Sequence, residues 1–443
     1  MKLFRLLIIA VSFVIYTVPV YAVNIGYSLF SAIRQSDNLT QNAQQLSGTA
    51  LISGGTFSFT SEGDGTWLTD ISGSLSREWF SIDEVATQDR GRISASVNYL
   101  SPSSNFEFLL RDDASQVPRN RFALQDVGNL VNVNVLSARP TYFFQLSATD
   151  VLFTEFTYVD TSRNGPTNVQ VGQQSVGSVN LNREIRYEKS LNESSEIALI
   201  LSSIDTKFKS VTTGGDFLQE NASLRWVGRG RFNQIQVEFG TANVINALDQ
   251  EFNTNIYNMF YVRQLNPRSN LNISYRKGVN LILRRNFIDS TIIVDDQLGS
   301  FGGVRKVKSG NLAYTVDGEL VSGAVQFFTT DFENPIGNNN ERRNGGNISI
   351  AYSLNQYFSS APQTNVTFNY RKNRNTIESV SNPDVINNIT SYRLRFNYFA
   401  TPAMSYYLSF LKRDSRSSSL TTQITNGDAN SVSIGFNYAP VIN

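Results

Sequence analysis

Two segments near the end of the chain, residues 391–398 and 431–438, alternate apolar and polar side chains residue by residue. In the first segment one face carries tyrosine, leucine and phenylalanine, and the other carries serine, arginine and asparagine. A period of two is typical of a β-strand with two chemically different faces. The same pattern recurs over hundreds of residues, and no helical period separates the repeats. It predicts a transmembrane β-barrel, in which apolar side chains face lipid and polar side chains face a lumen.

Bulk composition is compatible with this fold. The mean hydropathy of −0.22 would by itself indicate a soluble protein, but only every second residue of a barrel strand faces lipid. Aromatic residues make up 12% of the 443-residue chain, with 30 Phe and 19 Tyr, as expected if aromatic girdles mark both membrane interfaces. The net charge is +1 and no basic block is present, so we expect no nucleic-acid partner.

The sequence contains neither cysteine nor histidine. The lack of cysteine excludes disulfides, thiol chemistry and a lipid-anchored cysteine. The lack of histidine excludes Ser-His-Asp catalysis, HExxH zinc sites and histidine-based pH switches. We therefore predict a protein that is not an enzyme and that has no cofactor and no metal site.

Residues 1–22 have the three parts of a secretory signal peptide. Lys2 and Arg5 charge its start, residues 6–18 form the apolar stretch, and Val20-Tyr21-Ala22 provides a small-residue cleavage site. The apolar stretch is shorter than a transmembrane helix requires. We predict a signal peptide at 1–22 and an outer-membrane β-barrel domain at 23–443.

The alternation predicts 20 antiparallel strands. Counts of 18 or 16 also fit, because boundaries derived in this way are uncertain by about 2–4 residues. Short links are predicted to be periplasmic turns and long polar links to be surface loops, with both chain ends on the periplasmic side. The predicted strands are 24–34, 46–60, 66–80, 92–100, 105–112, 131–147, 151–161, 178–189, 193–208, 219–227, 232–244, 252–265, 270–277, 311–316, 319–330, 347–357, 364–373, 390–400, 405–413 and 431–438.

Four places carry a more specific prediction. Pro140 falls inside a predicted strand, where it cannot donate a ladder hydrogen bond, so we expect a bulge or a break there. Asp317-Gly318 is a strong hairpin-turn signal. Residues 113–129 are predicted to be a long polar loop, either functional or disordered. Residues 278–307 are irregular and mix charged with apolar residues, which indicates a large surface loop or a segment folded into the lumen.

Several charged side chains fall on the polar face of the predicted strands. On the lipid face at mid-membrane an Arg or Lys costs about 2–4 kcal/mol, which also favours an inward assignment. Guanidinium groups bind carboxylate, phosphate and sulfate through paired hydrogen bonds, so inward arginines are candidates for an anionic or hydroxyl-rich substrate. The alternative, which we favour slightly, is that arginines and glutamates pair across strands and fill the lumen. The charged residues are Arg92, Glu107, Arg111, Glu184, Arg186, Glu188, Arg225, Glu238, Arg276, Arg371, Arg393 and Arg395.

Aromatic and acidic side chains also have a functional and a structural interpretation. Phe143, Phe153 and Tyr407 fall on the polar face, and we name Phe143 and Tyr407 with the eight arginines as the candidate substrate pathway. Other aromatic residues are expected in the interfacial girdle rather than in a sugar-stacking platform, namely Trp67, Trp79, Tyr99, Trp226 and Tyr438. Acidic residues in predicted loops either bind divalent cations that bridge lipopolysaccharide or, as we favour, are solvated, namely Asp112, Asp113, Asp331, Glu333 and Glu341.

Short motifs resemble those of a known family. Gly26-Tyr27-Ser28 followed by Arg34-Gln35-Ser36-Asp37-Asn38, at the end of the first strand, is similar to the β-barrel porin 2 family. Leu136-Ser137-Ala138-Arg139-Pro140 and Tyr158-Val159-Asp160 also resemble that family. Its members are outer-membrane barrels associated with exopolysaccharide operons. The resemblance implies that the protein takes part in moving a secreted polysaccharide across the outer membrane, with a periplasmic export partner.

Three functions remain open from the sequence. The first is a conduit for export or surface assembly of an extracellular or capsular polysaccharide. The second is a general or selective diffusion porin for small solutes. The third is a closed barrel that anchors surface polysaccharide. All three place the chain among outer-membrane lipid and lipopolysaccharide.

Overall fold

The computed structural model contains one antiparallel β-sheet of 20 strands that closes into a barrel. It describes residues 22–39, 46–62, 66–83, 85–101, 105–118, 130–164, 177–209, 216–246, 249–279, 306–333, 339–355, 357, 364–379, 385–418 and 427–440. The predicted signal peptide therefore lies outside the described residues, except for Ala22. No helix in this part of the chain is long and apolar enough to cross a membrane.

Each strand pairs with the strands that precede and follow it in sequence, and the last strand pairs with the first. The predicted all-β, up-and-down barrel and its count of 20 strands are confirmed. The strands are β1 (Ala22–Ser36), β2 (Gly48–Glu62), β3 (Trp67–Phe80), β4 (Gln88–Leu100), β5 (Phe106–Pro118), β6 (Leu130–Gln145), β7 (Asp150–Asn164), β8 (Ser178–Asn192), β9 (Ser195–Phe208), β10 (Phe217–Arg229), β11 (Asn233–Asn246), β12 (Glu251–Asn266), β13 (Ser269–Val279), β14 (Lys306–Asp317), β15 (Val321–Glu333), β16 (Asn339–Ser353), β17 (Asn365–Ser379), β18 (Val385–Thr401), β19 (Met404–Ser417) and β20 (Gly427–Tyr438).

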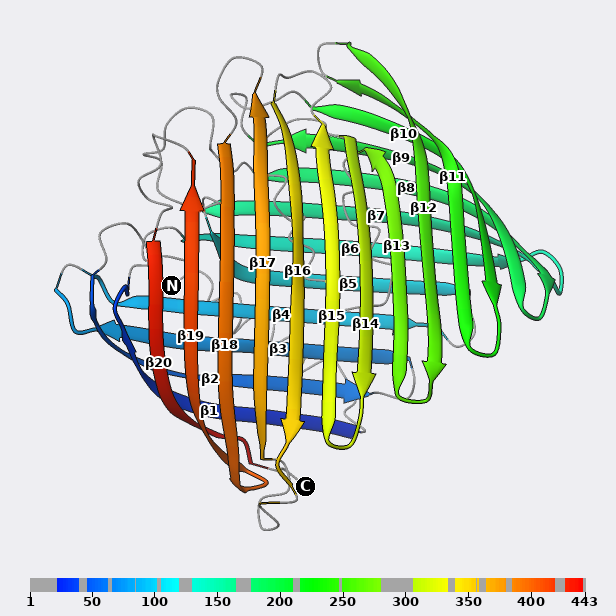
Figure 1. The fold of residues 1–443 in the computed structure, drawn as a ribbon. Coiled ribbons are helices and arrows are strands. Elements are labelled where there is room, and N and C mark those ends of the chain that lie inside the picture. Colours follow the sequence, from blue (N-terminus) through cyan, green and yellow to red (C-terminus); the bar gives the residue numbers. More distant parts are fainter. Residues whose placement is uncertain are drawn as a thin grey trace.

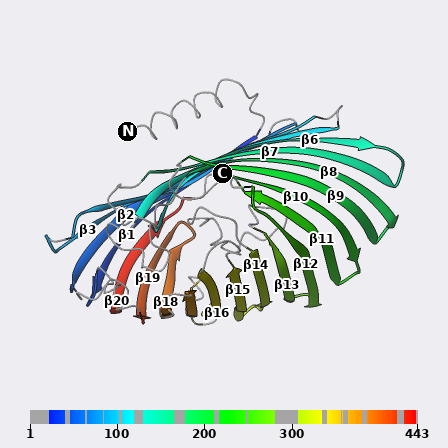
Figure 2. The ribbon, with the colours of Figure 1, turned by 90° about the horizontal axis from the view of Figure 1, so that it is seen from above.

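The barrel closes with a pronounced stagger between its first and last strands. Tyr438, the last residue of β20, pairs with Leu29, so the first seven residues of β1 extend beyond β20 and pair only with β2. Stagger of this kind tilts every strand relative to the barrel axis, typically by about 35–45°. In Figure 1 the strands β1–β9 of the far wall accordingly run across the strands β13–β20 of the near wall. Figure 2 shows the same two walls from above, facing each other across the interior.

The links between strands are short at one end of the barrel and longer at the other. Links that leave even-numbered strands hold two to five residues, except for the 11-residue link 354–364. Links that leave odd-numbered strands hold four to 26 residues. We call these ends the short-link edge and the long-link edge. The predicted alternation is confirmed, and the Asp317-Gly318 turn is present, with Gly318 N donating to Val321 O at 3.0 Å.

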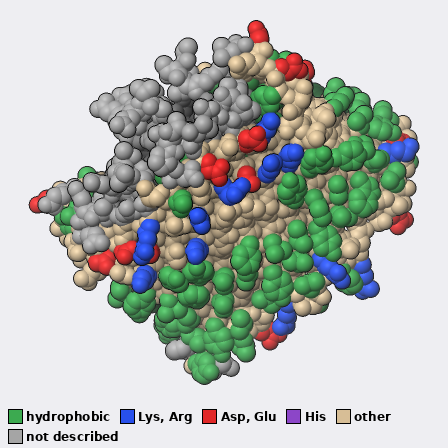
Figure 3. Space-filling model, turned by 45° about the horizontal axis from the view of Figure 1, so that its top comes forward, with side chains coloured by type: hydrophobic (Ala, Val, Ile, Leu, Met, Phe, Trp, Pro, Cys, Tyr) green, Lys and Arg blue, Asp and Glu red, His purple; other side chains and the backbone are tan. Residues whose placement is uncertain are grey.

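The ladder registers assign every strand residue to one of two faces. On β1 the exposed side chains of Ile25, Tyr27, Leu29 and Ile33 share one face, and their ladder partners continue that face around the barrel. It carries most of the large exposed hydrophobic residues, and Figure 3 shows these as a broad band on the outside of the molecule. This outward band is the apolar belt, and the opposite face lines the lumen.

Aromatic side chains form a continuous chain along the short-link edge of the belt. The Trp67 and Tyr99 ring centroids are 4.5 Å apart, Tyr99 and Phe106 6.4 Å, and Phe106 and Tyr142 4.6 Å. Trp79, Trp226 and Tyr438 also lie on the outward face and are exposed. This arrangement agrees with an interfacial girdle, because Trp and Tyr rings are amphipathic and favour the boundary between lipid and water.

The structure corrects several predicted boundaries at the long-link edge. β5 continues to Pro118 and β16 begins at Asn339, eight residues before the predicted start. The acidic residues predicted in loops therefore lie in strands, namely Asp112, Asp113, Asp331, Glu333 and Glu341. The reason is that these strand ends extend past the apolar belt, where both faces are polar and the alternation disappears. Residues 119–129 and 280–305 lie outside the described residues.

Pro140 interrupts the ladder between β6 and β7, as predicted. Pairing runs to Ala138 opposite Tyr158 and resumes at Thr141 opposite Glu155, so Arg139 and Pro140 have no ladder partner on β7. Proline has no N–H to donate, which accounts for the gap. The register is the same on both sides of the gap, so even-numbered residues of β6 face outward and odd-numbered residues face the lumen throughout the strand.

Candidate functional site

The lumen-facing side of the wall contains all ten residues of the predicted substrate pathway. Arg92, Arg111, Arg186, Arg225, Arg276, Arg371, Arg393, Arg395, Phe143 and Tyr407 all lie on the face opposite the apolar belt. The structure does not bring the ten together. It places most of them on two walls whose arginines have different surroundings.

The first wall carries a network of ion pairs. On β8 the Arg186 guanidinium lies between two glutamates, with Nε 2.9 Å from Glu188 and Nη1 3.3 Å from Glu184. On β10, Arg225 Nη2 approaches Glu188 at 2.5 Å. The side chains of Arg186 and Glu184 are only 15% and 10% exposed. On this wall the arginines fill the lumen and neutralise acidic neighbours, which is the structural alternative raised by the sequence.

Phe143 belongs to the same packed wall. Its ring meets Phe153 edge-on with 5.3 Å between centroids, and the Arg186 guanidinium lies 4.5 Å from the centre of the Phe153 ring. A cation held over an aromatic face is stabilised by the quadrupole of the ring. Phe143 thus packs against Phe153, whose ring in turn holds Arg186.

Ion pairs also involve arginines closer to the first strands. Arg111 on β5 binds Asp113 two residues along, with 2.5 Å between Nε and the carboxylate. Glu78 on β3 accepts a hydrogen bond from Arg34 on β1 and forms an ion pair with Arg90 on β4. Arg34, Arg90 and Asp113 were not among the predicted lumen residues. Arg34 follows from the alternation within its predicted strand, and Arg90 and Asp113 follow from it once their strands are extended to their true ends.

The second wall, formed by β17, β18 and β19, has a different character. Its inward positions carry the group that we call the arginine face, consisting of Arg371, Arg393, Arg395, Arg413 and Tyr407. Among the described residues, no inward position of β17–β20 is Asp or Glu. Arg371, Arg393 and Arg395 accordingly form no ion pair with an acidic side chain in the part of the chain that the structure describes.

The pairing of β17, β18 and β19 brings the arginines of the arginine face close together. Arg371 and Arg413 both flank Ser391, from the strands on either side of it, and they interact electrostatically with each other. Arg393 lies two residues farther along β18 and interacts with Arg395. Arg371 and Arg393 are exposed to the lumen. Like charges held this close repel each other, so an anion between them would relieve that repulsion.

Neutral side chains orient these guanidinium groups. Arg395 Nε donates to Asn397 Oδ1 at 2.7 Å, and its guanidinium lies 4.0 Å from the centre of the Tyr407 ring. With the Asn373 amide turned so that its oxygen faces Arg371, that oxygen accepts from Arg371 Nε and Nη2, each at 3.1 Å. The other inward residues here are mostly Ser, Asn and Thr, which both donate and accept hydrogen bonds. The wall can therefore hydrogen-bond hydroxyl groups and bind anionic groups.

Two predicted arginines lie away from both groups. Arg92 on β4 is exposed and lines a hollow of about 530 Å³ with Asp70, Ser94 and Arg111. Arg276 lies inward on β13. Arg413 is the member of the arginine face that the sequence analysis missed, and the period-two count from Tyr407 would have found it. No group of three or more acidic residues in the described part of the chain is placed to hold a metal ion.

Comparisons with known proteins find similar solved structures of low sequence identity. No family model matches the sequence, and no curated protein matches it. The FrpB iron transporter from Neisseria meningitidis is 9% identical, with a TM-score of 0.49, over 95% of this chain and 83% of that chain. The ferric citrate transporter FecA is 11% identical, with a TM-score of 0.45, over 94% and 78%. OpdO from Pseudomonas aeruginosa is 12% identical, with a TM-score of 0.41, over 95% and 98%.

Proposed function

We propose that this protein is an outer-membrane β-barrel conduit that takes part in the export or surface assembly of an extracellular or capsular polysaccharide. It is secreted through the signal peptide at residues 1–22, and a periplasmic export partner delivers the polysaccharide to it. The observation that carries the proposal is the arginine face, where Arg371, Arg393 and Arg395 face the lumen and pair with no acidic side chain among the described residues. The polysaccharide is acidic, because guanidinium groups bind carboxylate and sulfate.

A row of outward lysines supports placement in an outer membrane. Lys308, Lys372 and Lys412 each lie two residues beyond the last apolar outward residue or glycine of their strands, on the side of the long-link edge, and Lys277 lies two residues beyond Tyr275. Ammonium groups at this height favour anionic headgroups at the membrane surface. Lipopolysaccharide carries phosphates at that level, so the long-link edge would face the cell exterior and the short-link edge the periplasm.

The neutral part of the arginine face supports a sugar rather than a small inorganic anion. Asn365, Asn369, Asn397 and Ser409 lie on the same inward surface as the arginines. They extend along three strands, so they offer hydrogen bonds over a length that a chain of hydroxyl groups would use. Tyr407 adds an aromatic ring, and Arg395 already lies over one of its two faces. The motif resemblance near Arg34–Asn38 and Leu136–Pro140 points to the same class of substrate.

Deletion of the gene tests the proposal. We expect the deletion strain to lose most of its secreted or surface polysaccharide, and to accumulate the polymer in the periplasm. The measurement is the acidic polysaccharide content of culture medium, cell surface and periplasm, compared with a strain complemented in trans. Unchanged polysaccharide together with slower uptake of small anionic solutes would instead identify a diffusion porin. Polymer that reaches the medium but no longer stays on the cell surface would identify an anchor.

A further inference from the structure

Hydroxyl groups line one part of the lumen, on the strands β2, β3 and β4. The ladder registers place Thr56 beside Ser74, and Ser94 beside Ser72, all at inward positions. A hollow of about 530 Å³ runs along these residues and Ser96, and we call it the hydroxyl hollow. Its volume lies within the range of sites that bind small molecules, roughly 300–1,000 Å³.

Three hydroxyl groups of this hollow are free to bind a ligand. Ser72, Ser74 and Ser96 are half-buried, and their side chains form no hydrogen bond with the residues that the structure describes. Ser94, by contrast, accepts from Arg111 Nη2 at 3.4 Å. A hydroxyl group both donates and accepts hydrogen bonds. The three free serines therefore match the hydroxyl groups of a sugar, which also act both ways.

Opposite charges lie at the two ends of the hydroxyl hollow. Arg92 and Asp70 both line it, and both side chains are exposed. Arg92 pairs in register with Ser74, four residues along β3 from Asp70, so roughly 14 Å separates the Cα atoms of the two charged residues. Asp70 accepts a hydrogen bond from Thr60 at 3.4 Å. A ligand in the hollow thus meets a cation at one end and a carboxylate at the other.

Arg92 differs from the inward arginines beside it. Arg90 forms an ion pair with Glu78 at 3.3 Å, and Arg111 forms one with Asp113 at 2.5 Å. Arg92 forms no ion pair with any residue in the described part of the chain. A guanidinium that is exposed and holds no carboxylate of its own can bind one from a ligand, or a sulfate, through two parallel hydrogen bonds.

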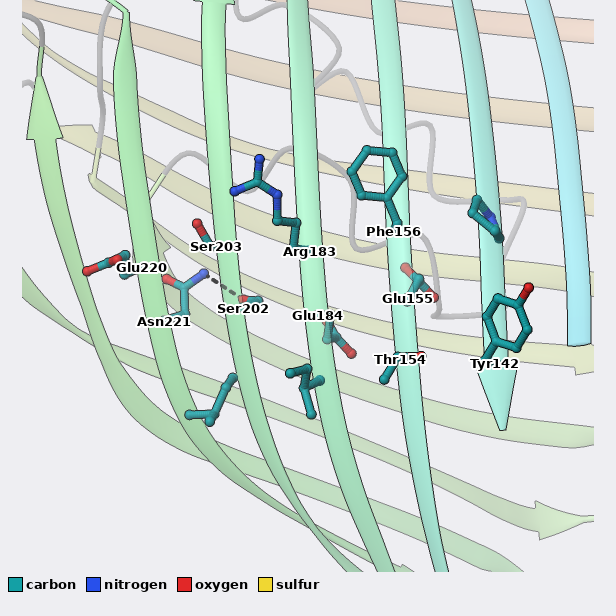
Figure 4. A pocket seen from close by; sticks show the side chains of 13 residues that line it. Tyr142, Thr154, Glu155, Phe156, Arg183, Glu184, Ser202, Ser203, Glu220 and Asn221 are labelled. Carbon is teal, nitrogen blue, oxygen red and sulfur yellow. Dashed lines mark hydrogen bonds between the residues drawn. The ribbon is translucent and has the colours of Figure 1, made fainter. Parts of the chain in front are cut away.

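The hydroxyl hollow faces the lumen, whereas a second hollow does not. The second hollow has a volume of about 590 Å³ and crosses β6–β10 (Figure 4). Most of its lining side chains, such as Tyr142, Phe156 and Arg183, are at outward positions. Most side chains that line the hydroxyl hollow are at inward positions of β2–β5. In Figure 1 these strands lie in the far wall and β17–β19 lie in the near wall, so the hydroxyl hollow is separate from the arginine face.

We propose that the hydroxyl hollow is a second sugar-binding subsite, and that it selects a polysaccharide whose acidic residues are separated by neutral ones. The subsite rests on the proposed function, because its ligand is the polymer that the lumen carries. Arg92 binds the carboxylate or sulfate of an acidic residue, and the free serines bind ring hydroxyls. Asp70 accepts hydrogen bonds from the hydroxyls of a neutral residue and repels an acidic group. A polymer that is acidic at every residue therefore fits the hollow less well.

Calorimetric titration of the folded barrel with two acidic oligosaccharides of equal length tests the subsite. One is a hyaluronan fragment, in which glucuronate alternates with a neutral sugar, and the other is an oligogalacturonate, which is acidic at every residue. Arg92→Gln is expected to weaken binding of the hyaluronan fragment about tenfold, the effect of one charge-assisted hydrogen bond. Asp70→Asn is expected to strengthen binding of the oligogalacturonate but not of the hyaluronan fragment. A damaged fold cannot produce such a gain.

The matched control is Arg77→Gln, on the outward face of β3, which is expected to leave both affinities unchanged. Folding of each variant is checked by the mobility of the unheated barrel on a denaturing gel. Wild-type protein that binds the oligosaccharides, with affinities that neither Arg92→Gln nor Asp70→Asn changes, would overturn the subsite and leave the proposed function standing. An Asp70→Asn variant that binds both sugars more tightly to the same extent would overturn the selectivity. Wild-type protein that binds neither sugar would overturn the proposed function and the subsite together.

Discussion

Replacing both Arg371 and Arg393 by glutamine is expected to weaken the block of the pore by an acidic oligosaccharide by about 10- to 100-fold. A hydrogen bond to a charged group contributes about 1.5–3 kcal/mol, and each 1.4 kcal/mol is a factor of ten in affinity. We take less than the full sum for two such bonds, because both side chains are exposed to water in the lumen. The measurement is the half-blocking concentration in planar bilayers.

Arg225→Gln is the matched control for this experiment. It removes one lumen arginine from the opposite wall, where Arg225 already binds Glu188 at 2.5 Å. The half-blocking concentration is expected to change by less than about threefold, since that guanidinium is committed to a carboxylate and its loss removes no free cation. An equal loss of block in Arg225→Gln and in the double variant would mean that the arginine face has no special role.

Arg186→Met is expected to lower the free energy of unfolding by about 3 kcal/mol. The change keeps side-chain volume but removes the cation between Glu184 and Glu188, whose side chains are 10% and 20% exposed. Removing one partner of a buried ion pair typically costs about 3–5 kcal/mol, and we expect the lower end because Glu188 keeps Arg225. Urea unfolding in lipid vesicles, followed by tryptophan fluorescence, measures the change.

Combining Arg186→Met with Glu184→Gln separates charge from packing and leaves Glu188 paired with Arg225. A neutral amide at position 184 no longer needs the cation, so this variant is expected to regain most of the lost stability. The Arg186 contact with the Phe153 ring is absent from both variants, so it cannot account for a difference between them. A combined variant as unstable as Arg186→Met would show that this aromatic contact, rather than the ion pairs, stabilises the wall.

The sequence was sufficient for the fold because the barrel obeys one simple rule. Side chains alternate between lipid and lumen, so the apolar positions of segments such as 391–398 mark both the strand and its outward face. The rule fails where strands leave the membrane. At Asp113 and Arg342 both faces meet water and the alternation is lost, so one predicted strand ended too early and the other began too late. Pro140 was informative for a separate reason: proline has no N–H to donate, so a strand that contains it must have a gap in its ladder hydrogen bonds.

The candidate site was predictable only in part. The inward face of Arg186, Arg225, Arg371 and Arg393 follows from the period of two. Whether an arginine is paired depends on which strands lie beside it and on their register. A glutamate reaches Arg225 from β8, 37 residues earlier in the chain, and none reaches Arg393 in the described part of the chain. No local pattern around either arginine carries that information, so the division into two walls required the structure.

The most direct test of the central claim is single-channel conductance of the folded wild-type protein in a planar bilayer. The readout is the conductance during titration with an acidic oligosaccharide and with a neutral one of the same length. We predict large conductance steps that the acidic sugar blocks at least about tenfold more strongly than the neutral one, as a single charge-assisted hydrogen bond would require. Steps that both sugars affect equally, or no steps from a correctly folded barrel, would contradict a conduit for an acidic polysaccharide.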